Sequence, residues 1–163
     1  DLTVQIDRRS LMTLYDVAPR FLRPQAPIGR ITHPELTTAA HKIFTAFGPQ
    51  ESWDEVIVEV KRPLTEHSTT EAARLREQLL CVREEGAAFD IGESSMELIG
   101  VDAPVFGLDG DVCAVLSVVS PIEHFGPAEK IAYANAARSV GADLSEELGA
   151  PLERVAFLRN RLR

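Results

Sequence analysis

Two carboxylates and one hydroxyl stand in otherwise apolar runs of the sequence. Asp90 ends the run "AAFD", Asp102 lies two residues after Gly100 in "GVDAPVF", and Ser117 interrupts "VCAVLSVV". An apolar surface that carries a few directed polar groups is the usual lining of a small-molecule site. The residue types and their surroundings therefore predict a binding pocket, and the elements that carry them must bring the three groups together.

The strand that carries Ser117 fixes which side chains share a face. Successive side chains of a strand point to opposite faces, so Ser117 shares its face with Cys113, Val115 and Val119. The same rule places Gly100 and Asp102 on one face of the preceding strand. If that face carries the pocket, Asp90 and Asp102 flank the ligand. Two like charges buried together raise one pKa or require a cation or hydrogen-bond donors. The alternative is a twist of the strand that turns Asp102 into solvent.

A helix is predicted from about Thr38 to Phe47, with Thr37 or Thr38 as N-cap and Gly48 at its end. The backbone N–H groups of Ala39 and Ala40 lie in its first turn, where they lack helical partners and the dipole favours an anion. His41 is expected at the rim of the same pocket. The alternatives are that both alanines are ordinary helix residues, that Ser117 bonds only to backbone or water, and that Asp90 caps a turn.

The other elements follow from periodicity and turn residues. Alternating runs predict an N-terminal hairpin from 2–7 and 11–17, and a strand at 87–91 precedes the hairpin 100–121, whose turn holds Asp109-Gly110. Helices are predicted at 53–62, at 68–86 with Ser68 or Thr69 as cap, and from Pro127 to Gly149. Strands at both ends with helices between them predict an α+β fold on a mostly antiparallel sheet of about six strands.

Composition excludes several classes of protein. With 163 residues, 45% hydrophobic and 26% charged, the chain is expected to form one globular domain. Its formal net charge of −8 would repel DNA from most of the surface. Neither a membrane helix nor a signal peptide is expected. Cys81 and Cys113 lie in apolar runs and are predicted to be buried free thiols in a reducing cytoplasm.

No catalytic constellation is recognised. The two cysteines have no nearby histidine, and no pair of His, Cys or Asp residues shows metal-ligand spacing, so neither an enzyme nor a bound metal or cofactor is expected. A hydrolase-like enzyme is the weakest alternative. A binding module for another ligand or for a protein partner is the stronger one, although no glycine-rich phosphate loop supports a nucleotide.

Three segments in the same order resemble a known family. "GRITHPELTTAAHKIFTAFGP", "LTEHSTTEAARLREQLLCVREEGAAFD" and "GVDAPVFGLDGDVCAVLSVVSP" are similar to the effector-binding domain of IclR-type bacterial transcriptional regulators, and the likeness spans Leu2 to Gly149. The resemblance implies a GAF-like fold with helices on the sheet faces, a small-molecule effector, and dimers or tetramers. It also implies that DNA is bound only through a winged helix-turn-helix that this chain lacks.

The resemblance also assigns pocket positions. Ala39 and Ala40 match a small-residue pair, Asp90 matches an aspartate, Gly100 a position that is often Cys, and Ser117 and Val119 two positions that are both Ser in some members. This chain departs from the family at Gly100 and Val119, and its His41-Lys42 replaces the usual Gly-Lys. Asp102 stands where a small apolar residue is common. The family implies a carboxylic or aromatic acid as effector, whereas two carboxylates favour a polyol or an amine.

The expected effector domain covers residues 1–149, and residues 150–163 form a basic amphipathic extension that the family usually lacks. Leu152, Val155 and Leu158 are predicted on one side of it, opposite Arg154, Arg159, Arg161 and Arg163. The extension could dock on the acidic body, dock on a partner subunit, or be solvated.

Overall fold

The computed structural model describes residues 2–7, 10–15, 29, 31–32 and 36–162. The proline-rich segment around Pro19, Pro24 and Pro27 lies outside the described residues. The helices are α1 (Ala39–Phe47), α2 (Trp53–Glu59), α3 (Ala72–Glu85), α4 (Pro127–Glu147) and α5 (Leu152–Arg159). The strands are β1 (Leu2–Asp7), β2 (Ser10–Tyr15), β3 (Ile31–Thr32), β4 (Ala88–Ile91), β5 (Leu98–Phe106) and β6 (Val112–Pro121).

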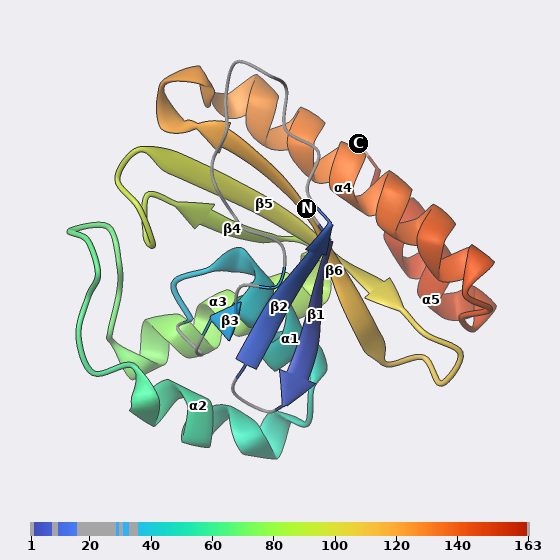
Figure 1. The fold of residues 1–163 in the computed structure, drawn as a ribbon, viewed down its shortest axis with the longest axis horizontal. Helices are drawn as coiled ribbons and strands as arrows, with labels where there is room; N and C mark the ends of the chain where they lie inside the picture. Colours follow the sequence, from blue (N-terminus) through green and yellow to red (C-terminus); the bar gives the residue numbers. More distant parts are fainter. Residues whose placement is uncertain (1, 8–9, 16–28, 30, 33–35, 163) are drawn as a thin grey trace.

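The strands form one antiparallel sheet in the order β3-β2-β1-β6-β5-β4 (Figure 1). The predicted α+β class with helices on the faces of an antiparallel sheet is confirmed. The central hairpin β5–β6 turns at Asp109-Gly110, where Gly110 has φ +80°, a conformation that glycine adopts without strain. Because this turn sets the register, Asp102 lies opposite Ser117 and Gly100 opposite Val119.

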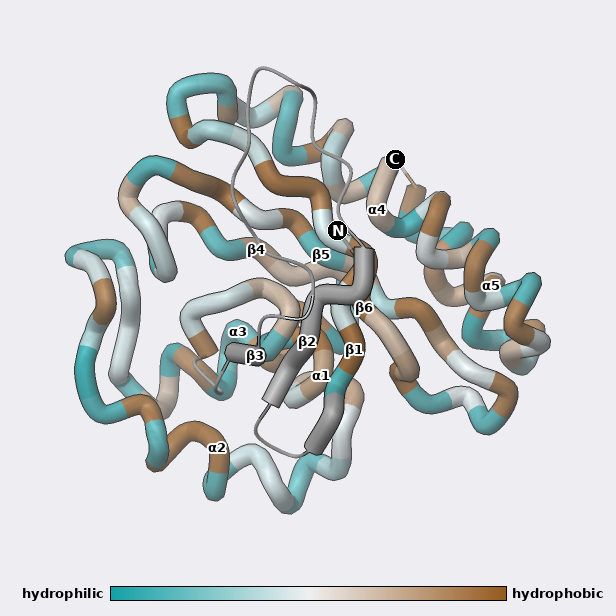
Figure 2. Tube along the Cα trace, in the orientation of Figure 1, coloured by the Kyte–Doolittle hydropathy of each residue, from teal (hydrophilic) through white to brown (hydrophobic). Residues whose placement is uncertain are grey.

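The sheet separates two helical layers. Ala39 and Ile43 of α1 share a core cluster with Ala88 and Val115 of the sheet, and α2 and α3 complete this layer. On the other face, Ala134 of α4 packs with Ile99 and Val101. Hydrophobic and hydrophilic residues alternate along α4 and α5, as expected of helices with one buried side (Figure 2). The face that carries Asp102 is therefore the face covered by α1.

A glycine allows α4 to lie close to the central strand. A Cβ atom at Gly141 would come within 2.8 Å of the carbonyl oxygen of Pro104 in β5. A side chain at this position would push the helix away from the sheet, because a backbone oxygen cannot move aside without disturbing the strand.

The start of α3 differs from the prediction. Its N-cap is Glu71, not Ser68 or Thr69. The Ser68 hydroxyl accepts hydrogen bonds from the backbone of Leu64 and Thr65 and donates to the carbonyl oxygen of Glu93 at 2.6 Å. Ser68 therefore ties the α2–α3 connection to the turn after β4. Serine was expected here as a helix cap, but the Ser68 hydroxyl instead bonds groups in the loop before α3 and in the turn after β4.

The prediction that both cysteines are buried is wrong: Cys81 and Cys113 are free and exposed. Cys81 lies on α3, whose buried side is formed by Leu75, Leu79 and Val82, so the cysteine falls on the outer side of the helix. The apolar neighbours in sequence were misleading because a helix places adjacent residues on different sides.

The C-terminal helix packs on the body of the domain. Val155 is 3% and Leu158 0% exposed, and the Phe157 ring makes edge-to-face contacts with Phe47 and Phe106 at centroid distances of 5.9 and 6.4 Å. The predicted apolar side is wrong at Leu152, which is 78% exposed at the first position of the helix. The packing corresponds to the docked alternative, and the extension supplies part of the core.

This packing predicts that Val155→Ala lowers the free energy of unfolding by about 1.5 kcal/mol, since about two buried methylene equivalents are lost. Leu152→Ala removes a larger side chain but is expected to change stability by less than about 0.5 kcal/mol, because that side chain is exposed. Urea denaturation of both variants measures the difference. Equal effects of the two substitutions would show that α5 does not hold this position in solution.

Candidate functional site

The fold brings the predicted sheet residues together on one face. Asp90 pairs with Gly100 across β4 and β5, and Asp102 pairs with Ser117 across β5 and β6. Gly100 lies between the two acids, because a Cβ atom there would be 3.7 Å from the Asp90 Cβ and 3.9 Å from the Asp102 Oδ1. Val119 is the cross-strand neighbour of Gly100. The strand parity read from the sequence therefore holds in three dimensions.

Asp102 is the most unusual group of this face. It is 4% exposed, so the alternative in which the strand turns it into solvent is wrong. Desolvation raises its pKa to about 7, a hydrogen bond from Ser117 opposes the rise, and the charge of Asp90 adds to it. The protonated carboxyl group is thus favoured by burial far more than it is favoured at an exposed aspartate. It can donate a hydrogen bond as well as accept one.

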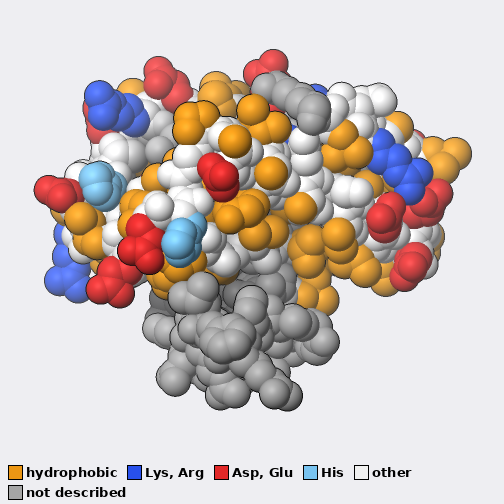
Figure 3. Space-filling view, turned by 90° about the horizontal axis from the view of Figure 1, so that it is seen from above, with side chains coloured by type: hydrophobic (Ala, Val, Ile, Leu, Met, Phe, Trp, Pro, Cys, Tyr) orange, Lys and Arg blue, Asp and Glu red, His pale blue; other side chains and the backbone are white. Residues whose placement is uncertain are grey.

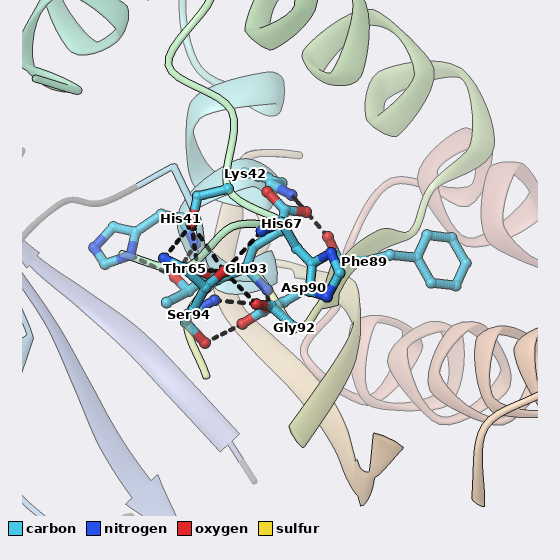
Figure 4. A network of polar contacts seen from close by, with 11 residues as sticks. His41, Lys42, Thr65, His67, Phe89, Asp90, Gly92, Glu93 and Ser94 are labelled. Atoms are coloured by element: carbon cyan, nitrogen blue, oxygen red, sulfur yellow. Dashed lines mark hydrogen bonds and ion pairs between the residues drawn. The ribbon is translucent and has the colours of Figure 1, made fainter. Parts of the chain in front are cut away.

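Asp90 is engaged by the turn that follows β4. Its Oδ1 accepts hydrogen bonds from the backbone N–H groups of Glu93 and Ser94 at 2.9 and 3.1 Å, and its Oδ2 accepts one from the Ser94 hydroxyl (Figure 4). The turn-capping alternative therefore describes the Asp90 carboxylate in this structure. The residue fixes the end of β4, and its charge faces Asp102.

The N-terminus of α1 lies over the same face. Thr38 is the N-cap, as predicted, and its hydroxyl accepts a bond from the His41 backbone N–H. Ala39 is 2% exposed and packs with Ala88 and Val115, while Ala40 is half-buried beside this core. Ala39 therefore has a packing role, whereas Ala40 is only partly covered by that core.

His41 lies inside the structure and not at a rim. It is 5% exposed, and its Nδ1 is 2.6 Å from the Thr38 hydroxyl oxygen. The imidazole thus belongs to the cap of α1. Among the described residues no group of three or more His, Cys, Asp or Glu side chains could hold a metal ion.

Sequence reasoning missed a buried ion pair beside the site. The Lys42 ammonium is 2.5 Å from the Glu93 carboxylate and donates a second bond to the Phe89 carbonyl oxygen at 2.8 Å (Figure 4). Burial raises the pKa of Glu93, and Lys42 opposes that rise. The available signal was a lysine next to Ile43 and Phe44 in a short helix, since a buried lysine needs an acidic partner. The sequence did not indicate that the partner is Glu93.

The chain matches the family model for the bacterial transcriptional regulator IclR C-terminal domain over residues 6–146. The chain belongs to this family. Curated IclR-type relatives include the HTH-type transcriptional regulator KdgR of Dickeya chrysanthemi, 29% identical over 88% of this chain and 48% of the relative. Another is the glycerol operon regulatory protein of Streptomyces griseus, 32% identical over 72% of this chain and 47% of the relative. The chain thus spans about half the length of these proteins.

Solved structures agree with the IclR-type fold. The Thermotoga maritima IclR crystal structure superimposes with a TM-score of 0.82 at 23% identity, covering 91% of this chain and 60% of that chain. The C-terminal domain of E. coli KdgR gives a TM-score of 0.75 at 24% identity, covering 91% and 85%. At these identities the structures support the fold alone.

This match confirms the resemblance to the IclR C-terminal domain that the sequence predicted, and the curated relatives it matches are named as transcriptional regulators. None of the helices in the described part of the chain combines the length and apolarity needed to cross a bilayer.

Proposed function

We propose that this IclR-type domain senses a small-molecule effector between α1 and the face of β4, β5 and β6. The observation that carries the proposal is the buried Asp102 carboxyl opposite Ser117, with Asp90 on the same face. A buried carboxyl group beside a hydroxyl offers directed hydrogen-bonding groups in an otherwise apolar surface, which is the usual lining of a small-molecule site. The proposed contacts are Ala40, Asp90, Gly100, Asp102, Ser117 and Val119, with Ala39 and His41 behind them.

The proposed effector is rich in hydroxyl or amine groups. Ionised Asp102 accepts hydrogen bonds from such groups, and Asp90 adds negative charge that disfavours an anion. Gly100 and Val119 lack the thiol and hydroxyl groups found in some members, which leaves a wider and less polar site. The name of the Streptomyces griseus relative refers to a glycerol operon, and this supports a polyol as the first class to test.

In the full-length regulator, effector binding would act on a winged helix-turn-helix that precedes this domain. The chain spans about half of its relatives, and its net charge of −8 suits a sensor better than a DNA-binding element. A ligand that binds one arrangement of a dimer or tetramer more tightly shifts the population toward it and changes the spacing of the DNA-binding domains. A regulator that acts on bacterial DNA works in the cytoplasm.

The test is a thermal-shift and calorimetry screen of glycerol, ribitol, ethanolamine, pyruvate and glyoxylate against the wild-type chain. We expect a polyol or amine to raise the melting temperature, because a ligand that binds only the native state stabilises it. Ser117→Ala is expected to weaken that ligand about fivefold through the loss of one hydrogen bond from the Ser117 hydroxyl to the ligand. Asp111→Asn, in the exposed hairpin turn, is the control and leaves affinity unchanged.

Two results would count against the proposal. Micromolar binding of pyruvate or glyoxylate with no response to polyols or amines would exclude the proposed effector class. Undiminished affinity of Ser117→Ala for whichever compound binds would place the binding site elsewhere.

A further inference from the structure

A groove of about 860 Å³ lies between α3 and α4 along β4, the edge strand of the sheet. Phe89 and Ile91 of β4 line it, as do Val82 of α3 and Ile131 and Ala134 of α4. Phe89 lies opposite Val101, on the face that packs against α4. The groove is therefore separate from the Asp102 site, which lies on the other face of the sheet.

The shape of the groove suits an extended apolar chain. Its lining includes Phe89 and Ile91, which point to the same side of β4, and Ala87, which comes just before that strand. A strand rises about 3.3 Å per residue, so these positions span roughly 13 Å. The α4 wall is incompletely covered, since Ile131 is 52% exposed. An unbranched alkyl chain of octanoate or decanoate length matches this apolar length.

One cation at the groove has no acidic partner among the described residues. Two pairs, Lys42 with Glu93 and Arg138 with Glu85, are neutralised within the lining. Lys130 is different: its ammonium lies 4.8 Å above the Phe89 ring and has no ion pair among the described residues. Arg74 also lines the groove but pairs with Glu71 just outside it, and the acidic Glu77 stands exposed on α3. The cation at the mouth is therefore Lys130, held over the apolar floor at Phe89.

We propose that this groove is a second ligand site, which binds a medium-chain alkyl carboxylate. The alkyl chain lies along Phe89 and Ile91, between Val82 and Ile131, and the carboxylate meets the Lys130 ammonium at the mouth. The edge of a β-sheet between two helices thus carries a binding function distinct from effector sensing on the opposite face. Apolar surface that a fold leaves uncovered commonly marks a binding site, and here the aliphatic walls stand apart with the Lys130 ammonium over the Phe89 ring.

Cys81 gives a direct reading of occupancy. It lines the groove and is exposed, whereas Cys113 is exposed but does not line it. Decanoate, below its micelle concentration, is expected to slow alkylation of Cys81 by N-ethylmaleimide and to leave Cys113 unaffected, as read by peptide mass spectrometry. Equal protection of both thiols, or of neither, would overturn the proposal.

Calorimetry with hexanoate, octanoate and decanoate tests the apolar floor and the cation separately. Each pair of added methylenes is expected to tighten binding about tenfold. Lys130→Gln is expected to weaken decanoate about fivefold, while Lys61→Gln, in the exposed loop before α3, does not. Equal binding of decyltrimethylammonium and decanoate would overturn the charge argument.

Ile131→Glu is expected to abolish decanoate binding by placing a carboxylate in the apolar wall. Val140→Glu, on the same helix, 45% exposed and outside the groove, is the matched control. Size-exclusion chromatography with light scattering excludes the competing occupant: if Ile131→Glu alone changes the oligomeric state, the groove is a contact between copies of the chain, and the ligand proposal is wrong. Response of the Asp102 site to polyols is measured in the same variants and does not depend on this outcome.

Discussion

The free energy of unfolding of Asp102→Asn, measured relative to the wild type, is expected to rise by about 2–3 kcal/mol from pH 5 to pH 8. The folded-state pKa of Asp102 is about 7, against an ordinary value of 3.8. Between these values the folded protein binds a proton that the unfolded chain releases. The wild type is therefore most stable at the acidic end and loses this stability as the pH rises through 7, whereas asparagine has no proton to lose.

Urea denaturation at pH 5, 6, 7 and 8 measures this difference, and Asp111→Asn serves as the control because Asp111 is exposed in the hairpin turn. Subtracting the wild-type curve removes the contributions of other titrating groups, including Glu93, whose pKa is also raised by burial. A flat difference for Asp102→Asn would mean that the Asp102 carboxyl is solvated in the folded domain. The basis of the proposed effector site would then be lost.

Lys42→Met is expected to lower the free energy of unfolding by about 3–5 kcal/mol. The substitution leaves the Glu93 carboxylate in a largely buried place without its cation and leaves the Phe89 carbonyl oxygen without its side-chain donor. The loss is larger than that from an exposed ion pair, because water cannot replace the missing partner. The turn after β4, whose backbone is capped by Asp90, would no longer be connected to α1 through the Lys42–Glu93 pair.

The double variant Lys42→Met/Glu93→Leu is expected to recover most of that loss, since two apolar side chains of similar size remove the unpaired charge. Lys61→Met, at an exposed position, is the control and is expected to change stability by less than about 0.5 kcal/mol. If Lys42→Met were as stable as Lys61→Met, the Lys42–Glu93 pair would be absent in solution. Chemical denaturation of the wild type and the three variants measures these differences.

Asp102 and Lys42 both depend on partners from other elements, and such long-range partners are what the sequence did not predict. Local features were predictable. The hairpin of β5 and β6 was read from its alternation and its Asp-Gly turn, and that reading placed Asp102 and Ser117 on one face. Thr38 and Gly48 marked the ends of α1 because capping depends on the nearest backbone groups. The positions of Cys81 and Leu152 were misjudged, since apolar neighbours in sequence do not show which side of a helix is covered.

The surface likewise has features that composition predicts and features that depend on the folded chain. Apolar side chains run across the middle of one face, between acidic side chains toward both of its ends (Figure 3). The net charge of −8 follows from composition, but the gathering of basic groups around the α3–α4 groove does not. It depends on residues from α1, α3 and α4 that meet only in the folded chain.

The sequence by itself determined the β5–β6 hairpin and its parity, the ends of α1, the acidic balance and the family. Each of these depends on backbone geometry over a few residues or on simple counting. Only the tertiary structure decided that α1 covers Asp102 and raises its pKa, and that Lys42 meets Glu93 from 51 positions away. Desolvation and ion pairing depend on which distant residues exclude water from a group, and no local pattern along the chain records that.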